Sequence, residues 1–405
     1  MIDDVTKNEI FSLIENVAEE MKISKYEIKF SVVPHHFVYG GGGILVSVHI
    51  TGTDYDDRQL HMDLSIKMSE KTSDDDYVRT VFKREIFFHK FIVPYLVKFL
   101  QKKSPPGSFK LCIPYCCRTF TTEDRDVLIF NRLQDLGYKQ TVGQLAIDQN
   151  IITSVLKALA TFHAVTYSAQ FEESGEFLSI INKWKPDIKD VFLLSNMENK
   201  LKTGLKMTLD MLMEENRYDI RDKLLKDIQK GTLSIIEDIL SNVPTETVIT
   251  HGDVWLHNVF VLFEKNNPTI AKDVKIIYWH LTTLHSPVLD LGYFFYLSSS
   301  ENINTNYEKY VEYYYSEFAE VLVRLGTDPA KFPFLTLLHH LENYSLMPLV
   351  IALGGIPLII LYDEMKVDVE EYETMQYANL QGNVKNLIKK KLLGILELHY
   401  KYYGE

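Results

Sequence analysis

The sequence is poor in cysteine, with only Cys112, Cys116 and Cys117 among 405 residues. An odd, clustered set of three does not form a disulfide framework. No second Cys/His pair accompanies it, so a structural zinc site is not expected either. The first four residues also lack the basic segment and apolar run of a signal peptide. These absences predict a protein of the reducing cytoplasm.

Long runs of positive charge are also missing. The 43 lysines and arginines are outnumbered by 55 aspartates and glutamates, which gives a formal net charge of −12 and a pI near 5.6. This acidity argues against sequence-independent binding of nucleic acid. The acidic run at 74–76 and the basic run at 389–391 are most simply solvated parts of helices. No nucleic-acid partner is therefore expected, and the sequence does not indicate an oligomeric state.

No apolar run is long and uninterrupted enough to predict a membrane span. The most apolar stretch is 346–362, but it contains Pro348, two adjacent glycines and Pro357. It also falls short of the ~20 apolar residues that a bilayer requires. We expect a broken pair of buried helices here and no membrane association.

What the sequence does contain is ample material for a core, since 46% of its residues are hydrophobic and 12% are aromatic. The expected elements are a helix near 10–21, strands between 26 and 68, a helix at 77–93 that Pro94 should stop or kink, strands on both sides of a turn at 121–126, helices after 141, and one β island at 247–281. The sequence thus predicts an α+β fold in two lobes. Residues 1–133 form a small β-rich lobe, and residues 134–405 form a large, mostly helical lobe.

One motif in the β island carries chemistry. His251 is followed by Asp253 and then, five positions later, by Asn258. This is the spacing of a kinase catalytic loop, in which the aspartate accepts the proton of the attacking hydroxyl and the asparagine binds magnesium. A polar loop between strands is the alternative interpretation. The strand expected at 247–250 and the hairpin expected after Asn258 favour the catalytic loop.

The same region lacks a second metal ligand. The returning strand of that hairpin should bring position 278 beside the catalytic loop, where a kinase of this type has an aspartate, but the residue is Tyr278. A neutral phenol is a poor ligand for magnesium, and the nitrogen of His280 is no better. Losing several kcal/mol of charge stabilisation would slow phosphoryl transfer by roughly a thousandfold or more. The sequence therefore predicts a degenerate metal position.

A lysine and a glutamate of the small lobe form a candidate pair. Residues 61–68 alternate in polarity, and Lys67 lies on the polar face of this strand. On the next helix Glu85 lies in an inward apolar stripe, where a carboxylate is costly without a positive partner. A solvated strand lysine is the alternative for Lys67 alone. The position of Glu85 favours the ion pair that binds nucleotide phosphates in kinases.

Four consecutive glycines precede one of the expected strands. The run comprises Gly40, Gly41, Gly42 and Gly43. Their backbone N–H groups could approach phosphates, as in other glycine-rich loops. The run matches no phosphate-binding motif, and a flexible hairpin turn explains it equally well. Both interpretations stay open at this point.

Together these segments resemble the ecdysteroid kinase-like proteins, relatives of choline kinases and aminoglycoside phosphotransferases. The resemblance covers most of the chain and rests on four segments, 82–88, 159–164, 251–258 and 286–291. It implies a protein-kinase-like fold and ATP-dependent phosphorylation of a hydroxyl on a small molecule, with ecdysteroids or foreign compounds as substrates. ATP and magnesium are the implied cofactors.

The resemblance also implies roles for individual residues. Asp253 would be the catalytic base, Asn258 the magnesium ligand, and Lys67 with Glu85 the phosphate-positioning pair. Asp290 would be a structural carboxylate that braces the catalytic region. His163 is better explained as a buried helix residue than as a catalyst. The aromatic residues from 293 to 318 either line an acceptor pocket or, as we favour, form the core.

Two departures from the family pattern leave two main hypotheses. Tyr278 replaces the usual aspartate, and residues 131–133 read Asn-Arg-Leu where the family has Glu-Asp-Leu. The second change is tolerable because adenine can bind the backbone of this link. The chain is then either a small-molecule kinase that works with one metal or a pseudokinase that acts through nucleotide or partner binding. A scaffold that binds no nucleotide is a weaker third option.

Overall fold

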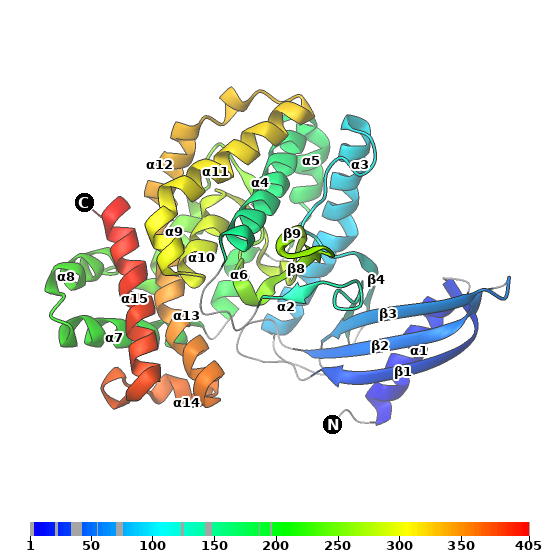
Figure 1. Ribbon diagram of the computed structural model, residues 1–405, viewed down its shortest axis with the longest axis horizontal. Coiled ribbons are helices and arrows are strands. Elements are labelled where there is room, and N and C mark those ends of the chain that lie inside the picture. The colour runs from blue at the N-terminus through cyan, green and yellow to red at the C-terminus, as the bar shows by residue number, and fades with distance from the viewer. Residues whose placement is uncertain are drawn as a thin grey trace.

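The computed structural model describes residues 4–20, 23–33, 43–54, 56–69, 76–122, 125–141, 148–185, 187–194 and 197–404. Its architecture is the α+β one expected, with a small antiparallel sheet beside a large helical lobe (Figure 1). The small lobe and the helices after it comprise α1 (Asp4–Glu20), β1 (Ile23–Val33), β2 (Ile44–Asp54), β3 (Gln59–Met68), α2 (Asp76–Phe87), η2 (Phe88–Ile92), α3 (Val93–Lys103), β4 (Cys116–Thr121) and β5 (Asp126–Asn131).

The large lobe contains most of the helices and the β island. Its elements are β6 (Lys139–Gln140), α4 (Gln149–Glu172), α5 (Ser174–Ile181), α6 (Ile188–Leu194), α7 (Met197–Glu214), α8 (Tyr218–Asp227), α9 (Thr232–Ser241), β7 (Val248–Thr250), η3 (Leu256–Asn258), β8 (Val259–Glu264), β9 (Asn267–Ile276), η4 (Trp279–Leu281), β10 (Thr283–His285), α10 (Val288–Leu297), α11 (Glu301–Leu325), η5 (Pro329–Lys331), α12 (Phe334–Tyr344), α13 (Leu346–Met365), α14 (Val369–Thr374), η6 (Tyr377–Asn379) and α15 (Gly382–Tyr402).

The small sheet has the strand order β1-β2-β3-β5-β4, and all its neighbours are antiparallel. Alternation in β3 works as predicted, because Leu64, Ile66 and Met68 are buried together against α1. Lys67 therefore leaves the opposite face of the sheet. This face is the one turned towards the large lobe and the pocket described below.

The helix after β3 does not end where Pro94 suggested. A five-residue π-helical turn, η2, interrupts the helix just before Pro94, and α3 then continues to Lys103. Pro94 lies in the first turn of α3. A backbone N–H group there would have no partner within the helix, so its absence costs little stability. The irregularity thus precedes the proline, and the helical segment runs about ten residues beyond the end expected.

The expected broken helix pair at 346–362 is also a single helix. α13 runs from Leu346 to Met365 with Pro357 inside it. In the described part of the chain it is long and apolar enough to cross a membrane, yet 72% of its apolar segment is buried inside the protein. Core helices pass the same test, so this is weak evidence for a membrane span.

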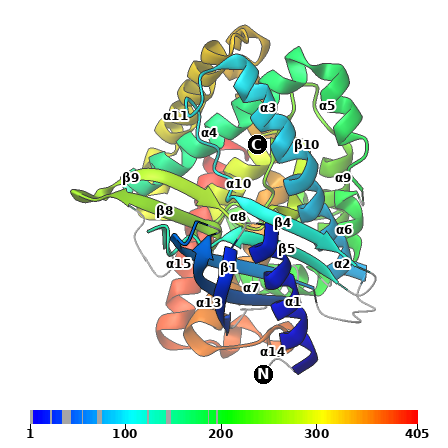
Figure 2. The same ribbon diagram turned by 90° about the vertical axis from the view of Figure 1, so that its right-hand side faces the viewer.

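The core of the large lobe includes the aromatic residues from 293 to 318. Tyr293, Phe294 and Phe295 of α10 are almost fully buried, as are Tyr314 and Phe318 of α11. The interpretation of this stretch as core is therefore correct for these residues. The β island stands beside this core, and its β8–β9 hairpin lies just above the small sheet in both views (Figures 1 and 2). The hairpin brings the segment after β9 to the boundary between the lobes.

Candidate active site

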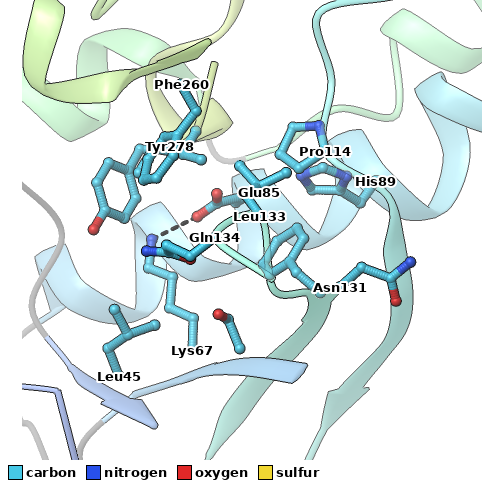
Figure 3. Close-up of a pocket in the computed structure, with 13 residues that line it drawn as sticks. Leu45, Lys67, Glu85, His89, Pro114, Asn131, Leu133, Gln134, Phe260 and Tyr278 are labelled. Atoms are coloured by element: carbon cyan, nitrogen blue, oxygen red, sulfur yellow. Dashed lines mark hydrogen bonds and ion pairs between the residues drawn. The ribbon is translucent and has the colours of Figure 1, made fainter. Parts of the chain in front are cut away.

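A pocket of about 90 Å³ lies where the two lobes meet (Figure 3). Its walls come from β2 and β3, from α2 and η2, from the link that follows β5, and from β8 and the segment after β9. The lining residues are Leu45, Ser65, Lys67, Glu85, His89, Pro114, Phe130, Asn131, Leu133, Gln134, Phe260, Ile277 and Tyr278. The fold thus brings Lys67, Glu85 and Tyr278 into one pocket, together with the link residues Asn131 and Leu133.

Lys67 and Glu85 form an ion pair, as the sequence led us to expect. Lys67 Nζ donates to Glu85 Oε2 at 2.6 Å, and both side chains are buried. Burial acts to raise the pKa of Glu85, but the charge of Lys67, with smaller contributions from His280, His89 and the Lys67 hydrogen bond, holds that pKa at about 2. The glutamate is therefore ionised at neutral pH and neutralises the lysine.

Two aromatic rings cover the ammonium group of Lys67. Its Nζ lies 4.9 Å from the ring centroid of Phe82 and 4.9 Å from that of Tyr278, both within cation–π range. Figure 3 shows the Tyr278 ring beside the lysine on the pocket side. The Tyr278 backbone has φ 70° and ψ 64°, a left-handed conformation uncommon for residues other than glycine. The tyrosine at the predicted second metal position thus packs on the candidate phosphate-binding lysine.

Helix α2 is fastened to the segment that follows Tyr278. The backbone N–H of Trp279 donates to Glu85 Oε1 at 3.2 Å. One residue earlier, the buried guanidinium of Arg84 donates to the carbonyl oxygen of His280 at 3.0 Å and to that of Thr282. Two adjacent side chains therefore hold α2 against the large lobe. Sequence reasoning missed Arg84, since an arginine outside the apolar stripe gives no sign of burial.

The predicted catalytic loop is a compact turn between β7 and β8. The Asn258 side-chain amide donates to the Asp253 backbone oxygen at 2.9 Å and to Asp253 Oδ2 at 2.7 Å. Both partners are acceptors, which assigns the amide nitrogen to this side and leaves the amide oxygen for another contact. Burial raises the pKa of Asp253 to about 7, against hydrogen bonds from Asn258 and Trp255 that lower it.

Asp290 holds the start of this loop through hydrogen bonds to its backbone. It accepts hydrogen bonds from the backbone N–H groups of His251 and Gly252, each at 2.7 Å. His163 Nε2 lies 3.0 Å from the same carboxylate, and His163 Nδ1 lies 2.7 Å from the Tyr314 hydroxyl. These contacts support a structural role for Asp290. They place His163 in the buried network that positions the loop, and not in the pocket.

Tyr278 stands between the two sets of candidate residues. Burial raises the pKa of its phenol, and the negative charges of Glu85 and Asp253 raise it further. The phenol therefore stays neutral at physiological pH. Asp253 and Asn258 are not among the residues that line the 90 Å³ pocket. Tyr278 lines that pocket and is also near enough to Asp253 for the charge of this carboxylate to act on its phenol.

The glycine run is only partly described. Gly40, Gly41 and Gly42 lie outside the described residues. Gly43 has φ +117°, and a Cβ there would meet the Met68 carbonyl oxygen and the Phe82 ring. It does not line the pocket. Close packing accounts for the glycine at this position, and phosphate binding by the run stays a prediction.

The oxygen donors fit one magnesium ion but not two. The carboxylate of Asp253 and the amide oxygen of Asn258 are hard donors of the kind magnesium prefers. At the second position the chain supplies the neutral phenol of Tyr278. His280, two residues later, is buried with a pKa lowered to about 3 and offers only nitrogen. A site of the usual two-metal kind is therefore incomplete.

The kinase-like class of proteins combines a small antiparallel sheet and a large helical lobe with a lysine–glutamate pair in the first and an Asp–Asn loop in the second, and this chain has these features. Within this class, the chain belongs to the ecdysteroid kinase-like family, whose model matches residues 42–327. The segments that suggested this family in the sequence at 82–88, 159–164, 251–258 and 286–291 all lie inside the match.

Individual relatives are more distant. The 4-hydroxytryptamine kinase of Psilocybe cyanescens is 22% identical over 162 residues, which cover 40% of this chain and 41% of that protein. The 4-hydroxytryptamine kinase of Psilocybe cubensis is 28% identical over 78 residues, or 19% and 20% of the two chains. The matches thus span less than half of either relative. A crystal structure of an aminoglycoside-3'-phosphotransferase of type VIII aligns over 90% of this chain and 93% of its own, with 12% identity and a TM-score of 0.28.

Proposed function

We propose that this protein is an ATP-dependent phosphotransferase that phosphorylates a hydroxyl group of a small molecule. The observation that carries the proposal is the hydrogen-bonded pair of Asp253 and Asn258 on a loop braced by Asp290. The family supports the same class of reaction. ATP would enter at the boundary between the lobes, with its adenine against the link at 131–134.

In this proposal Asp253 acts on the acceptor. Its carboxylate accepts the proton of the substrate hydroxyl as the oxygen attacks the γ-phosphorus, and the bond to ADP breaks. A pKa near 7 suits a general base that works at neutral pH. The amide of Asn258 keeps the carboxylate in place. Magnesium, when held by Asn258 and Asp253, would neutralise charge on the transferring phosphate.

The acceptor is proposed as an apolar alcohol or phenol. The family name points to steroid alcohols, and the two curated relatives are named for a hydroxylated indole. Both kinds of molecule carry a hydroxyl group on a rigid fused-ring skeleton. A panel that contains ecdysteroids, simple sterols and 4-hydroxytryptamine therefore covers the candidate substrates.

The test is turnover of ATP with this panel in the presence of magnesium or manganese. We expect slow turnover, about a thousandfold below the 1–100 s⁻¹ of ordinary kinases, because one metal ligand is missing. Asp253→Asn should abolish it, and Tyr278→Asp should raise it by a comparable factor. Turnover that survives Asp253→Asn would contradict the proposal.

A second candidate is a pseudokinase, which the packing of Tyr278 on Lys67 favours. The outcome that would select it is no turnover by the natural sequence together with restored turnover in Tyr278→Asp. A scaffold that binds no nucleotide is the remaining option. Thermal stabilisation by ATP would count against that option, because only a ligand that binds the folded state raises the melting temperature.

A further inference from the structure

Among the residues that the structure describes, the pocket between the lobes offers no accessible positive charge. Lys67 is the only lysine or arginine in this described lining, and it is 2% exposed. The ammonium group donates to Glu85 at 2.6 Å, and the rings of Phe82 and Tyr278 cover it. A phosphate group that reached this lysine would therefore have to displace a ring and share the charge with a carboxylate.

The rest of the lining is largely apolar. Leu45 forms one wall, Phe130 and Leu133 another, and Phe260 and Ile277 close the side of the large lobe. The pocket measures about 90 Å³, well below the roughly 300–1,000 Å³ of usual small-molecule sites. Such apolar walls suit a flat ring, and within the described lining the place beside Lys67 is taken by the rings of Phe82 and Tyr278.

The ring of Tyr278 covers Lys67, and the backbone beside it is held in place by the neighbouring residue, Trp279. The residue after Tyr278 is fixed on both sides, because the Trp279 N–H donates to Glu85 and its indole N–H donates to the Ile276 carbonyl at 2.7 Å. The indole also stacks on Phe88, with ring centroids 4.6 Å apart and planes at 5°. To uncover Lys67, the Tyr278 side chain must rotate while its backbone stays in place.

We propose that the pocket binds a flat, uncharged heteroaromatic ligand of the nucleoside class, and that Tyr278 stands where phosphates would have to lie to reach Lys67. Phosphate groups then add little to affinity, because their contact with Lys67 requires the ring to move away. This inference deepens the proposed function, since it concerns the same pocket. Tyr278 then has two effects: it removes a metal ligand, and its ring keeps the phosphate groups of a nucleotide away from Lys67.

The test compares the affinities of adenosine and ATP for the full chain by calorimetry, with and without magnesium. For the natural sequence we expect the two affinities to agree within about threefold and magnesium to change neither. Tyr278→Asn removes the ring and tolerates the left-handed backbone. This variant should favour ATP over adenosine by at least tenfold, because the phosphates then reach Lys67.

Two further variants identify the cause. Tyr278→Phe keeps a ring over the lysine and should leave the affinity ratio as in the natural sequence. Adding Lys67→Gln to Tyr278→Asn should remove the gained preference for ATP. A tenfold preference for ATP in the natural sequence, an unchanged ratio in Tyr278→Asn, or no binding of either ligand would each overturn the inference.

The inference and the proposed function fail separately. Turnover by the natural sequence or by Tyr278→Asp tests only the function. The ratio of the two affinities tests only the role of the ring over Lys67. If Tyr278→Asn changes the ratio of the ATP and adenosine affinities but no variant shows turnover, the inference holds and the kinase proposal fails. If the natural sequence shows turnover and also binds ATP much more tightly than adenosine, the kinase proposal holds and the inference fails.

Discussion

The ion pair of Lys67 and Glu85 is a buried contact between β3 and α2. Both charges have left water, so each depends on the other for compensation. Glu85 also accepts from the backbone of Trp279, which makes it the junction of the strand, the helix and the segment after β9. At the scale of single residues, this pair is where a substitution should cost most.

We predict that Lys67→Met and Glu85→Leu each lower the free energy of unfolding by about 3–5 kcal/mol, because each leaves a buried charge without its partner. The double variant should lose clearly less than the sum. Urea unfolding of the four proteins measures this coupling. The matched control is the exposed helix pair of Glu198 and Lys202, 2.6 Å apart, whose removal should cost less than about 1 kcal/mol. Additive losses at Lys67 and Glu85 would contradict the prediction.

Among the elements, α13 shows how packing overrides local signals. Its two adjacent glycines face different surroundings. A Cβ at Gly354 would lie 2.8 Å from the Leu201 Cα on α7. In the same way, a Cβ at Gly204 of α7 would lie 2.6 Å from the Gly354 Cα. A Cβ at Gly355 would meet nothing within 4 Å. Gly354 thus allows α7 and α13 to pack closely. Gly355 has no such packing role, and its effect is only the low helix propensity of glycine.

This contrast gives a paired prediction. Gly354→Ala should destabilise the protein by about 1–3 kcal/mol, because the new methyl group overlaps α7 and forces the helices apart. Gly355→Ala should be neutral or stabilise by up to about 1 kcal/mol, as alanine favours the helix more than glycine does. Thermal unfolding of the two variants makes the comparison. Equal effects of the two substitutions would show that the α7–α13 contact is not this close.

At the scale of the whole molecule, several buried histidines set the response to acid. Burial lowers the pKa of His285, His340 and His399 to about 4 each, from an ordinary value of 6.5. Folding therefore favours their neutral forms. In the unfolded chain the same residues take up protons below pH 6.5, so the unfolded state binds more protons than the folded one in that range.

We predict that the free energy of unfolding falls as the pH drops from 6.5 towards 4, because the three histidines outweigh the opposite contribution of Asp253, whose pKa in the folded state is raised to about 7. Each of these histidines contributes a slope of up to about 1.4 kcal/mol per pH unit. Urea unfolding at pH 7.5, 6.5, 5.5 and 4.5 measures it. His399→Gln removes one titrating group while keeping a partner for Tyr296, so its profile should be flatter. A natural protein equally stable at pH 7.5 and 4.5 would be incompatible with this account.

How much the sequence predicts differs between the fold and the site. The strand that carries Lys67 and the stripe that carries Glu85 follow from periods of two and 3.6 residues, which are local properties. A buried carboxylate demands a cation, so even their pairing across 18 positions could be inferred. The spacing of Asp253 and Asn258 is likewise local. The α+β architecture follows from the distribution of such patterns along the chain.

Other features depended on contacts between distant segments. The stop expected at Pro94 and the break expected within 346–362 were wrong, because the helical segments continue to Lys103 and Met365 through both prolines; an irregular π-helical turn does lie directly before Pro94. The burial of Arg84 depends on carbonyl groups almost 200 positions away.

By itself, the sequence determined which residues are candidates for the site and that a tyrosine stands at the predicted second metal position, since both are matters of residue type and spacing. Only the tertiary structure decided where the replacing side chain lies. Tyr278 and Lys67 are 211 positions apart, and no periodic pattern relates them. Their contact exists because β3, α2 and the segment after β9 converge on one buried ion pair.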